Sequence, residues 1–159
     1  MMNRFMIILI FAGTLLLSAC GAASAEGTGV EAHDPWARAA LKDGNSAVYL
    51  LLHNHSTQDD ALVGVSSNVA TAVEIHLSQI KANGTMEMVQ QESIALPADG
   101  EVEIKPGGYH IMLVGLKKDL NIGEKITITL HFMHHEDISL TVPVLDAAGM
   151  GGSGMDNMP

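Results

Sequence analysis

From residue 34 to about residue 145, short apolar runs alternate with turn-forming residues, and no long stretch has helical periodicity. Apolar side chains at every second position predict strands, because successive side chains of a strand point to opposite faces. Turn signals, of which Asn83-Gly84 is the strongest, separate the runs. The pattern predicts an all-β domain, a Greek-key β-sandwich or barrel of seven to eight short strands. The predicted strands are residues 47–52, 61–66, 72–77, 85–90, 101–104, 109–114, 125–132 and 138–144.

The first twenty residues have the features of an export signal rather than of a folded domain. A short basic start precedes the apolar residues 5–17, a run too short for a comfortable membrane span. The run ends in Leu-Ser-Ala-Cys-Gly, which resembles the lipobox that bacterial signal peptidase II recognises and cleaves just before the cysteine. We therefore predict a signal peptide over residues 1–19 and a lipid on Cys20, which would hold the protein on the periplasmic or outer face of a bacterial membrane. An ordinary secretory signal with a chance cysteine is the alternative.

The segments that flank the predicted domain are poor in patterned apolar residues. Residues 20–33 are rich in Gly, Ala and Ser, which predicts a flexible tether between the lipid and the domain. Residues 146–159 contain mostly Gly and Met without alternation, and we expect a disordered tail. The predicted β domain covers residues 34–145, and most of the candidate metal ligands described below lie in it.

Charge and cysteine content exclude several classes of function. Removing Arg4 with the signal peptide leaves seven of the eight basic residues against eighteen acidic ones, which argues against nucleic-acid binding. Cys20 is the only cysteine, so the chain has no internal disulfide. If Cys20 carries lipid, no thiolate remains for a blue-copper electron-transfer site. The catalytic motifs G-x-S-x-G and H-E-x-x-H are also absent, so we expect that the protein is not an enzyme.

Three of the predicted strands carry His or Met side chains on one face. His76 points away from the apolar Ile75 side of its strand, and His110 and Met112 point together away from Ile111. Met88 lies on a third strand, where it shares a face with Met86. Each residue alone is more simply explained as core or surface, but paired strands would bring the set within ligand distance.

Two imidazoles and two thioethers suit one metal ion best. Thioether sulfur is soft and neutral and favours Cu(I) over Mg²⁺ or Ca²⁺. Zinc sites more often include thiolate or carboxylate beside His. We therefore predict a four-coordinate Cu(I) site made by His76, Met88, His110 and Met112.

The spacing of these residues resembles the signature of the periplasmic copper chaperone family called PCuAC. That signature is His, an optional Met, ten residues, Met, twenty-one residues and His-x-Met; Leu77 stands at the optional place, and every other element fits. The segments 34–39, 47–50 and 105–113 also resemble the family. The resemblance implies a cupredoxin-like sandwich with an accessible Cu(I) site. It further implies delivery of copper towards the CuA subunit of cytochrome c oxidase, sometimes alongside a Sco-type thiol protein.

A further group of His and Met residues lies outside this signature. We consider them candidates for a secondary site, where added imidazoles would also allow Cu(II), or else idle solvated residues. Met86 is either an alternative donor or packing. His33 in the tether and the pair His53 and His55 are expected to be incidental surface residues. The secondary candidates are Met86, His131, Met133, His134, His135, Met150, Met155 and Met158.

Two non-catalytic alternatives to copper delivery remain open at this point. A storage or resistance protein would sequester copper with the same ligands, so the sequence does not separate it from a chaperone. A metal-free lipoprotein module of sandwich type would make the His and Met spacing a coincidence.

Overall fold

The computed structural model of the protein describes residues 29–146, which form strands and their connections. The predicted all-β class is confirmed, with ten strands rather than seven or eight, and all eight predicted strands are present. The two additional strands are β1 and β6. The strands are β1 (Val30–Arg38), β2 (Ser46–Asn54), β3 (Asp60–Ser66), β4 (Ala70–Ile80), β5 (Met86–Gln91), β6 (Ile94–Leu96), β7 (Gly100–Ile104), β8 (Tyr109–Leu116), β9 (Lys125–Phe132) and β10 (Ile138–Leu145).

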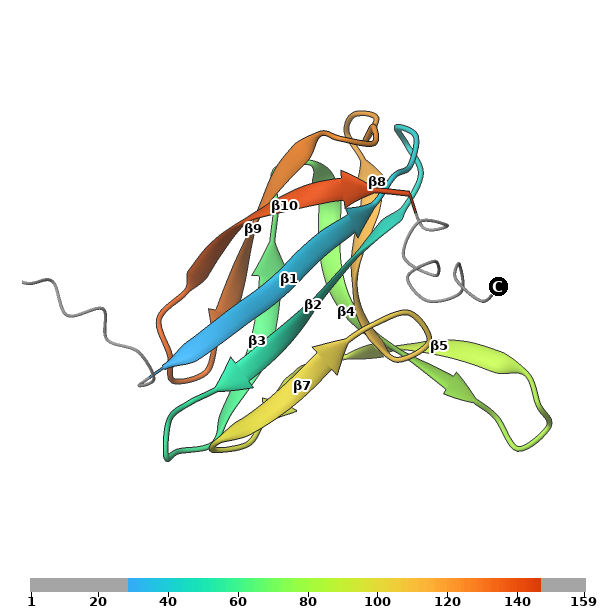
Figure 1. The fold of residues 1–159 in the computed structure, drawn as a ribbon. Helices are drawn as coiled ribbons and strands as arrows, with labels where there is room; N and C mark the ends of the chain where they lie inside the picture. The colour runs from blue at the N-terminus through green and yellow to red at the C-terminus, as the bar shows by residue number, and fades with distance from the viewer. Residues whose placement is uncertain (1–28, 147–159) are drawn as a thin grey trace, which may run out of the picture.

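The strands form one continuous sheet that folds over on itself into two layers (Figure 1). The strand order is β5-β4-β8-β7-β2-β1-β10-β9-β3-β6, and β8 also pairs with the first half of β2. A short parallel pairing of β1 with β10, at Ala37–Val144 and Arg38–Leu145, joins the two layers. The hairpin of β4 and β5 extends away from the body of the sandwich.

Apolar side chains from both layers form one core between them. Ile111 and Leu113 of β8 are fully buried, and they pack in the same cluster as Leu62 of β3 and Ile128 of β9. Each such side chain contributes about 1.5–3 kcal/mol when it leaves water. The alternate residues of β8, which include His110 and Met112, therefore lie on the other face of the sheet, away from this core.

Strand β1 begins at Val30, inside the segment 20–33 that the sequence predicts to be a tether. Antiparallel pairing with β2 orders this segment, and Val30 lies opposite Asn54. The alternation that would announce β1 is interrupted at Asp34, which has a φ of 48°, and the register shifts between His33 and Trp36. This irregularity explains why the apolar pattern alone does not predict the strand.

The predicted turn at Asn83-Gly84 is present at the tip of the β4–β5 hairpin. Gly84 has a φ of 82°, a left-handed conformation that glycine adopts without steric cost. The Lys81 N–H donates to the Thr85 carbonyl at 2.8 Å and closes the turn. This turn fixes which residues of β5 lie opposite β4.

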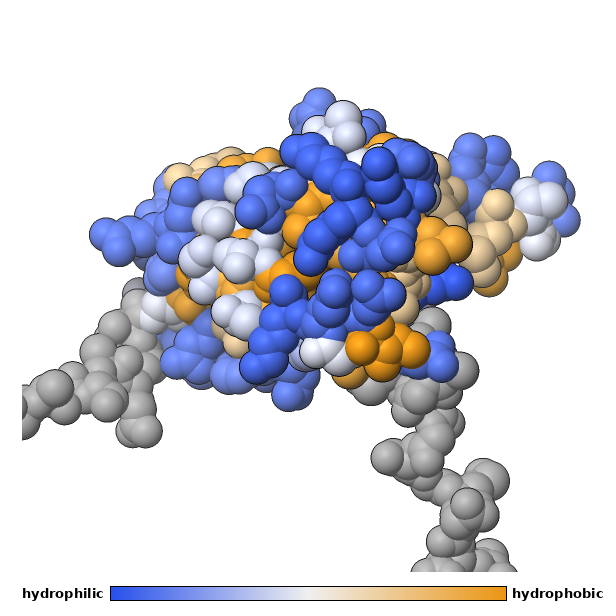
Figure 2. Space-filling view, turned by 90° about the horizontal axis from the view of Figure 1, so that it is seen from above, coloured by the Kyte–Doolittle hydropathy of each residue, from blue (hydrophilic) through white to orange (hydrophobic). Residues whose placement is uncertain are grey.

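Cys20 and the tail methionines Met150, Met155 and Met158 lie outside the described residues. Within residues 29–146 there is no helix long and apolar enough to cross a membrane. Seen from above, the surface is mostly hydrophilic with separate apolar areas (Figure 2). The large apolar side chains that are exposed are Leu41, Val63, Ile80, Met86, Met88, Ile122 and Met133.

Candidate metal centre

The predicted copper ligands lie on three neighbouring strands, β5, β4 and β8. His76 of β4 is directly opposite His110 of β8, and Met112 is opposite Glu74. On the other side of β4, Met88 of β5 is opposite Ser78. Directly opposite residues share a face, and diagonal neighbours remain within reach of long side chains. The register therefore places all four predicted ligands on the same face of the sheet.

The two histidines form a close pair at the centre of this face. Their ring centroids are 5.7 Å apart, with the planes inclined by 50°. His110 is buried, with 4% of its surface exposed, and the His76 side chain is 16% exposed. Imidazoles this sheltered from water need partners for their nitrogens.

Each histidine has one nitrogen held by a protein acceptor. His110 Nδ1 lies 3.1 Å from the carbonyl oxygen of Gly108. His76 Nε2 lies 2.8 Å from Oε2 of Glu74. A carbonyl and an ionised carboxylate only accept hydrogen bonds, so in both cases the histidine nitrogen donates.

The second nitrogen of each histidine is buried and has no hydrogen-bond partner. These atoms are His76 Nδ1 and His110 Nε2. In the neutral form of imidazole that binds metals, the proton sits on the nitrogen that donates, and the second nitrogen offers a free lone pair. Histidine ligands of metals are commonly oriented in this way, with the second ring N–H donated to a carboxylate or carbonyl. The two rings thus fit a metal ion at the nitrogens that the protein leaves unpartnered.

A pocket of ≈ 330 Å³ adjoins His110 and contains three of the four predicted ligands. Met88 and Met112 line it, and Ser78 lies between the strands that carry them. The small side chain of Ser78 leaves room between Met88 and His110. Met86 lines the same pocket and is 64% exposed, so it remains a candidate alternative donor.

A tight turn before β8 positions the carbonyl that orients His110. Gly107 has a φ of 80°, and the Gly108 N–H donates to the Lys105 carbonyl at 3.1 Å. The Ser78 N–H in turn donates to the Gly108 carbonyl at 3.1 Å, which ties the turn to β4. The turn formed by Lys-Pro-Gly-Gly therefore positions the carbonyl that accepts the hydrogen bond from His110, the histidine of the His-x-Met pair.

An aromatic residue and one cation border the pocket on the β2 side. Tyr49 packs on Trp36 with ring centroids 4.5 Å apart. Burial raises the pKa of Tyr49, and the nearby charge of Arg38 opposes this change without cancelling it. Tyr49 thus stays a neutral phenol, and the pocket wall adds no anionic oxygen that would favour a hard metal ion.

The secondary candidates on β9 and the following loop do not converge in the same way. Both nitrogens of His131 are bonded, Nε2 to Ser66 Oγ at 2.9 Å and Nδ1 to Asp137 Oδ2 at 2.8 Å. Asp60 accepts hydrogen bonds from the backbone N–H groups of Met133, His134 and His135 at 2.9–3.1 Å. Burial acts to raise the pKa of Asp60, but hydrogen bonds from backbone N–H groups, including that of Ala61, outweigh it and lower the pKa. The loop is therefore held through its backbone.

A second cluster of donors lies at the start of β1, and it includes His33 and His55, which the sequence predicts to be incidental surface residues. Glu31, His33 and His55 place one potential ligand atom each within 4.8 Å of one another, the one such group of His, Cys and acidic residues among residues 29–146. Glu31 and His33 have the period-two spacing of one strand face, and this signal was available in the sequence. It was missed because β1 was not predicted as a strand.

Comparisons with known proteins agree with this architecture. The family model described as "Putative lipoprotein LpqE-like" matches residues 30–144. A protein of Leifsonia xyli subsp. xyli described as "Putative lipoprotein Lxx21020" is 34% identical over 122 residues, which are 76% of this chain and 72% of that protein.

Solved structures with the same fold include copper-bound domains. One is described as "Copper-bound PCuAC domain from PmoF2"; it is 26% identical, has a TM-score of 0.63, and the match covers 76% of this chain and 95% of that chain. Another, the solution structure of CuI-DR1885 from Deinococcus radiodurans, is 28% identical with a TM-score of 0.56, over 81% of this chain and 87% of that chain. This protein therefore belongs to the LpqE-like family and shares the cupredoxin-like fold of PCuAC domains.

Proposed function

We propose that this protein is an extracytoplasmic copper chaperone, anchored by a lipid on Cys20, that carries Cu(I) and delivers it towards the CuA site of cytochrome c oxidase. His76, Met88, His110 and Met112 would hold the ion. The observation that carries the proposal is the pair of buried, unpartnered nitrogens, His76 Nδ1 and His110 Nε2, on the strand face that also carries Met88 and Met112. The copper-bound domains of the same fold support copper as the cargo.

The donor set favours the cuprous ion over the other common metal ions. Two neutral thioethers and two neutral imidazoles add no negative charge, and soft sulfur suits Cu(I). Glu74 lies on the same face, but its carboxylate oxygen Oε2 is 2.8 Å from His76 Nε2. It therefore orients a ligand instead of offering the metal a hard oxygen.

The uneven exposure of the ligands suits release by ligand exchange. His110 is buried, whereas Met88 is 55% exposed at the edge strand β5. A neutral thioether is a modest donor, so an incoming thiolate or imidazole on a partner would displace Met88 first. The sheltered histidines would then hold the ion until the partner completes its own coordination. This carriage needs no redox change and no catalysis, so we class the protein as a carrier.

A Cu(I) titration under reducing conditions, against a competing chelator, tests the site. We expect one tightly bound ion, with mixed nitrogen and sulfur scattering in the X-ray absorption spectrum. Met88→Ala should weaken binding, and the matched variant Met86→Ala, on the same strand and face, should weaken it less. A shell of nitrogen and oxygen alone would reject the site.

The identity of the acceptor requires a transfer experiment. Mixing the Cu(I)-loaded protein with an apo CuA domain or an apo Sco-type protein should move the metal. Replacing Met88 and Met112 by Cys should slow the transfer, because thiolates hold Cu(I) more tightly. Copper could instead stay on the protein in the presence of each acceptor, and the protein could accumulate copper in cells. These two results together would favour storage over delivery.

The lipid anchor is tested separately from copper. Cys20 lies outside the described residues, so the proposed lipid anchor depends on the lipobox and on the lipoprotein descriptions of the matching family and relative. Mass spectrometry of the mature protein should find a diacylglyceryl group on Cys20. A mature chain that starts elsewhere and carries no lipid would contradict the anchor and leave the copper site untouched.

A further inference from the structure

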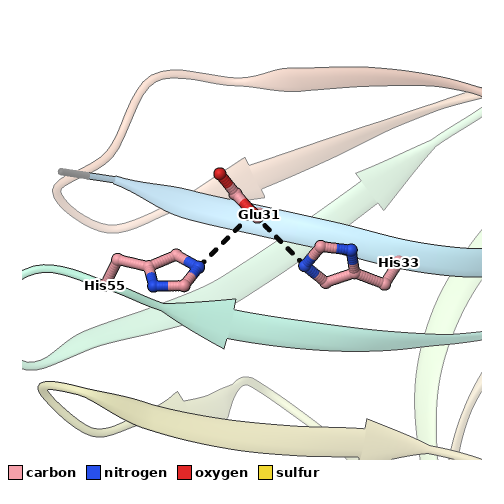
Figure 3. Close-up of side chains that lie close together, drawn as sticks. All are labelled: Glu31, His33 and His55. Atoms are coloured by element: carbon pink, nitrogen blue, oxygen red, sulfur yellow. Dashed lines mark ion pairs between the residues drawn. The ribbon is translucent and has the colours of Figure 1, made fainter. Parts of the chain in front are cut away.

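We propose a second, sulfur-free metal site formed by Glu31, His33 and His55, which binds a divalent transition-metal ion, Cu²⁺ ahead of Zn²⁺. This site is separate from the His–Met pocket and does not depend on the proposed function. It lies at the other end of the same layer, where β1 begins and β2 ends (Figure 3).

Strand pairing brings the three residues together from two parts of the chain. Glu31 and His33 are two residues apart on β1 and therefore project from the same face. Glu31 is opposite His53 of β2, and His55 follows two residues later, so it comes to the same face. The His55 N–H donates to the Gly29 carbonyl at 2.9 Å and continues the pairing beyond the strand. The backbone thus fixes the positions of the donors.

The distances between the donor atoms fit a shared metal ion. Oε2 of Glu31 lies 3.3 Å from Nε2 of His33 and 3.3 Å from Nε2 of His55. In a tetrahedral site with bonds of about 2.0–2.1 Å, two ligand atoms are roughly 3.3–3.4 Å apart. Figure 3 shows the two rings on either side of the carboxylate, each with a nitrogen towards it.

The contact between Glu31 and His55 is close but is not a hydrogen bond. His55 Nε2 is shielded from solvent and has no hydrogen-bond partner, even though the Glu31 oxygen is 3.3 Å away. The two atoms are near each other without being aligned for donation. Two ligand atoms of one ion have this relation, because each directs a lone pair at the ion and not at the other ligand.

A neighbouring histidine fixes the orientation of His55. The rings of His53 and His55 are in contact, with centroids 3.7 Å apart and planes tilted by 39°, and His53 Nδ1 lies 3.5 Å from Oε1 of Glu101. The His55 ring therefore has a wall on one face, which limits its rotation. Support of this kind around a ligand raises metal affinity, because less side-chain freedom is lost on binding.

The chemistry of the donors selects the ion. Two imidazoles and one carboxylate, without sulfur, suit Cu²⁺ and Zn²⁺ and do not favour Cu(I). For a given set of N and O donors Cu²⁺ binds more tightly than Zn²⁺, and the exposed side chains of Glu31 and His33 are free to move from the tetrahedral spacing to the tetragonal arrangement that Cu²⁺ prefers. The side chains of Glu31 and His33 are 47% and 45% exposed, so water can complete the coordination.

The test is a Cu²⁺ titration of the mature full-length chain, in which Cys20→Ser keeps the protein soluble, with and without His76→Ala and His110→Ala. We expect a bound Cu²⁺ ion in both backgrounds, with electron paramagnetic resonance showing hyperfine coupling to two imidazole nitrogens. His33→Ala and His55→Ala should each weaken binding at least about 10-fold and remove one nitrogen coupling. Zn²⁺ should bind at the same site more weakly.

Two matched variants make the result decisive. Glu103→Gln removes a carboxylate that pairs with Lys105, and His131→Ala removes a histidine whose nitrogens are both bonded. Neither should change the affinity. If a histidine variant fails to fold, Glu31→Gln should still weaken Cu²⁺ binding while keeping the shape of the side chain. Unchanged affinity and spectrum in Glu31→Gln and in the folded histidine variants would overturn the site.

Discussion

The His–Met face of β4, β5 and β8 and the cluster on β1 and β2 both contain two histidines, yet they offer different sets of donors to a metal ion. On the His–Met face, the Glu74 carboxylate and the Gly108 carbonyl each hold one nitrogen of a histidine, and the second nitrogen of each ring is buried without a partner. In the cluster, the carboxylate stands between the two histidines. An acid that only orients a ligand leaves the set of ligand atoms neutral and soft, whereas an acid among the ligands makes the set anionic and harder. The position of one carboxylate relative to the imidazoles thus changes the preferred ion.

Burial strengthens the same contrast. His110 is 4% exposed, so an ion bound to it loses much of its hydration and must be one that tolerates this loss. The singly charged Cu(I) ion loses less on dehydration than a doubly charged one. The cluster is open to water and can keep part of the hydration shell of a divalent ion. A protein that meets copper in both oxidation states would therefore separate them by site.

Replacing His110 by Ala should produce the largest effect and should affect only one of the two sites. It removes the buried imidazole at the centre of the pocket, and we expect Cu(I) affinity to fall by more than the roughly 10–100-fold typical of losing a supporting partner. Competition with a Cu(I) chelator measures the change. Cu²⁺ binding that needs His33 and His55 should stay the same.

A matched control separates ligand loss from general damage. Phe132 and the other core residues lie between the two layers, so circular dichroism and thermal unfolding of His110→Ala should report an intact sandwich. If both Cu(I) and Cu²⁺ affinities fell together in a folded variant, the two regions would be one coupled site and the contrast would be lost.

The sequence predicts which His and Met residues share one face of β4, β5 and β8, because that information is local. Period-two alternation places His110 and Met112 on one face of their strand, and the structure has Ile111 and Leu113 buried on the other. The turn residues Asn83-Gly84 set the hairpin that carries Met88 back beside β4. The sequence does not predict the roles of Glu74 and Gly108, because those depend on rotamers and on the geometry of one turn.

The sequence fails to predict the cluster because its information is non-local. Glu31 and His55 come together only through the register of β1 with β2, and β1 itself is hidden by the irregularity at Asp34 and Pro35. Because the first residues of β1 are assigned to a tether, the sequence indicates no strand partner that would bring another metal ligand close to His33. Short strand β6 is missed for a related reason: its three residues are too few to show alternation.

Removing Glu74 should produce an intermediate effect. Glu74→Ala frees His76 Nε2, so the ring loses the contact that sets its tautomer and orientation, and Cu(I) affinity should fall about 10–100-fold. The measurement is the same chelator competition. Glu103→Gln, another surface carboxylate on a strand of the same layer, should leave the affinity unchanged.

Glu74→Gln refines this result. The amide oxygen can still accept the His76 N–H, so affinity should lie between wild type and Glu74→Ala. If the Cu(I) affinity instead rose in Glu74→Ala, Glu74 would compete with the metal for His76. The contrast between an orienting and a ligating carboxylate would then fail.

The smallest effect should come from Asp60, which supports the region behind the second cluster. Asp60 fixes the loop of Met133–His135 by accepting backbone N–H groups. His135 lies so close to Gly29 that a Cβ there would stand 2.6 Å from its Nε2, and the Gly29 carbonyl accepts the N–H of His55. Asp60→Asn should lower the free energy of unfolding by about 1–2 kcal/mol, because hydrogen bonds to a charged acceptor become weaker neutral ones.

The pH dependence of the stability that Asp60 contributes follows from the direction in which folding changes its pKa. Burial opposes ionisation of Asp60, but the backbone N–H donors prevail and hold its pKa below the ordinary 3.8. The folded state therefore binds this proton less readily than the unfolded state, so the stability from Asp60 is present above about pH 3.8 and is lost as pH falls through the folded pKa. Urea unfolding of wild type and Asp60→Asn should differ most near pH 7 and converge in acid, while exposed Glu92→Gln should change little at either pH. A difference that stayed constant down to pH 3 would mean that the carboxylate charge is not what holds the loop. If the charge of Asp60 does hold the loop, Asp60→Asn should weaken Cu²⁺ binding at the β1–β2 cluster and leave Cu(I) binding unchanged. If the charge does not hold the loop, Cu²⁺ binding should be unchanged as well.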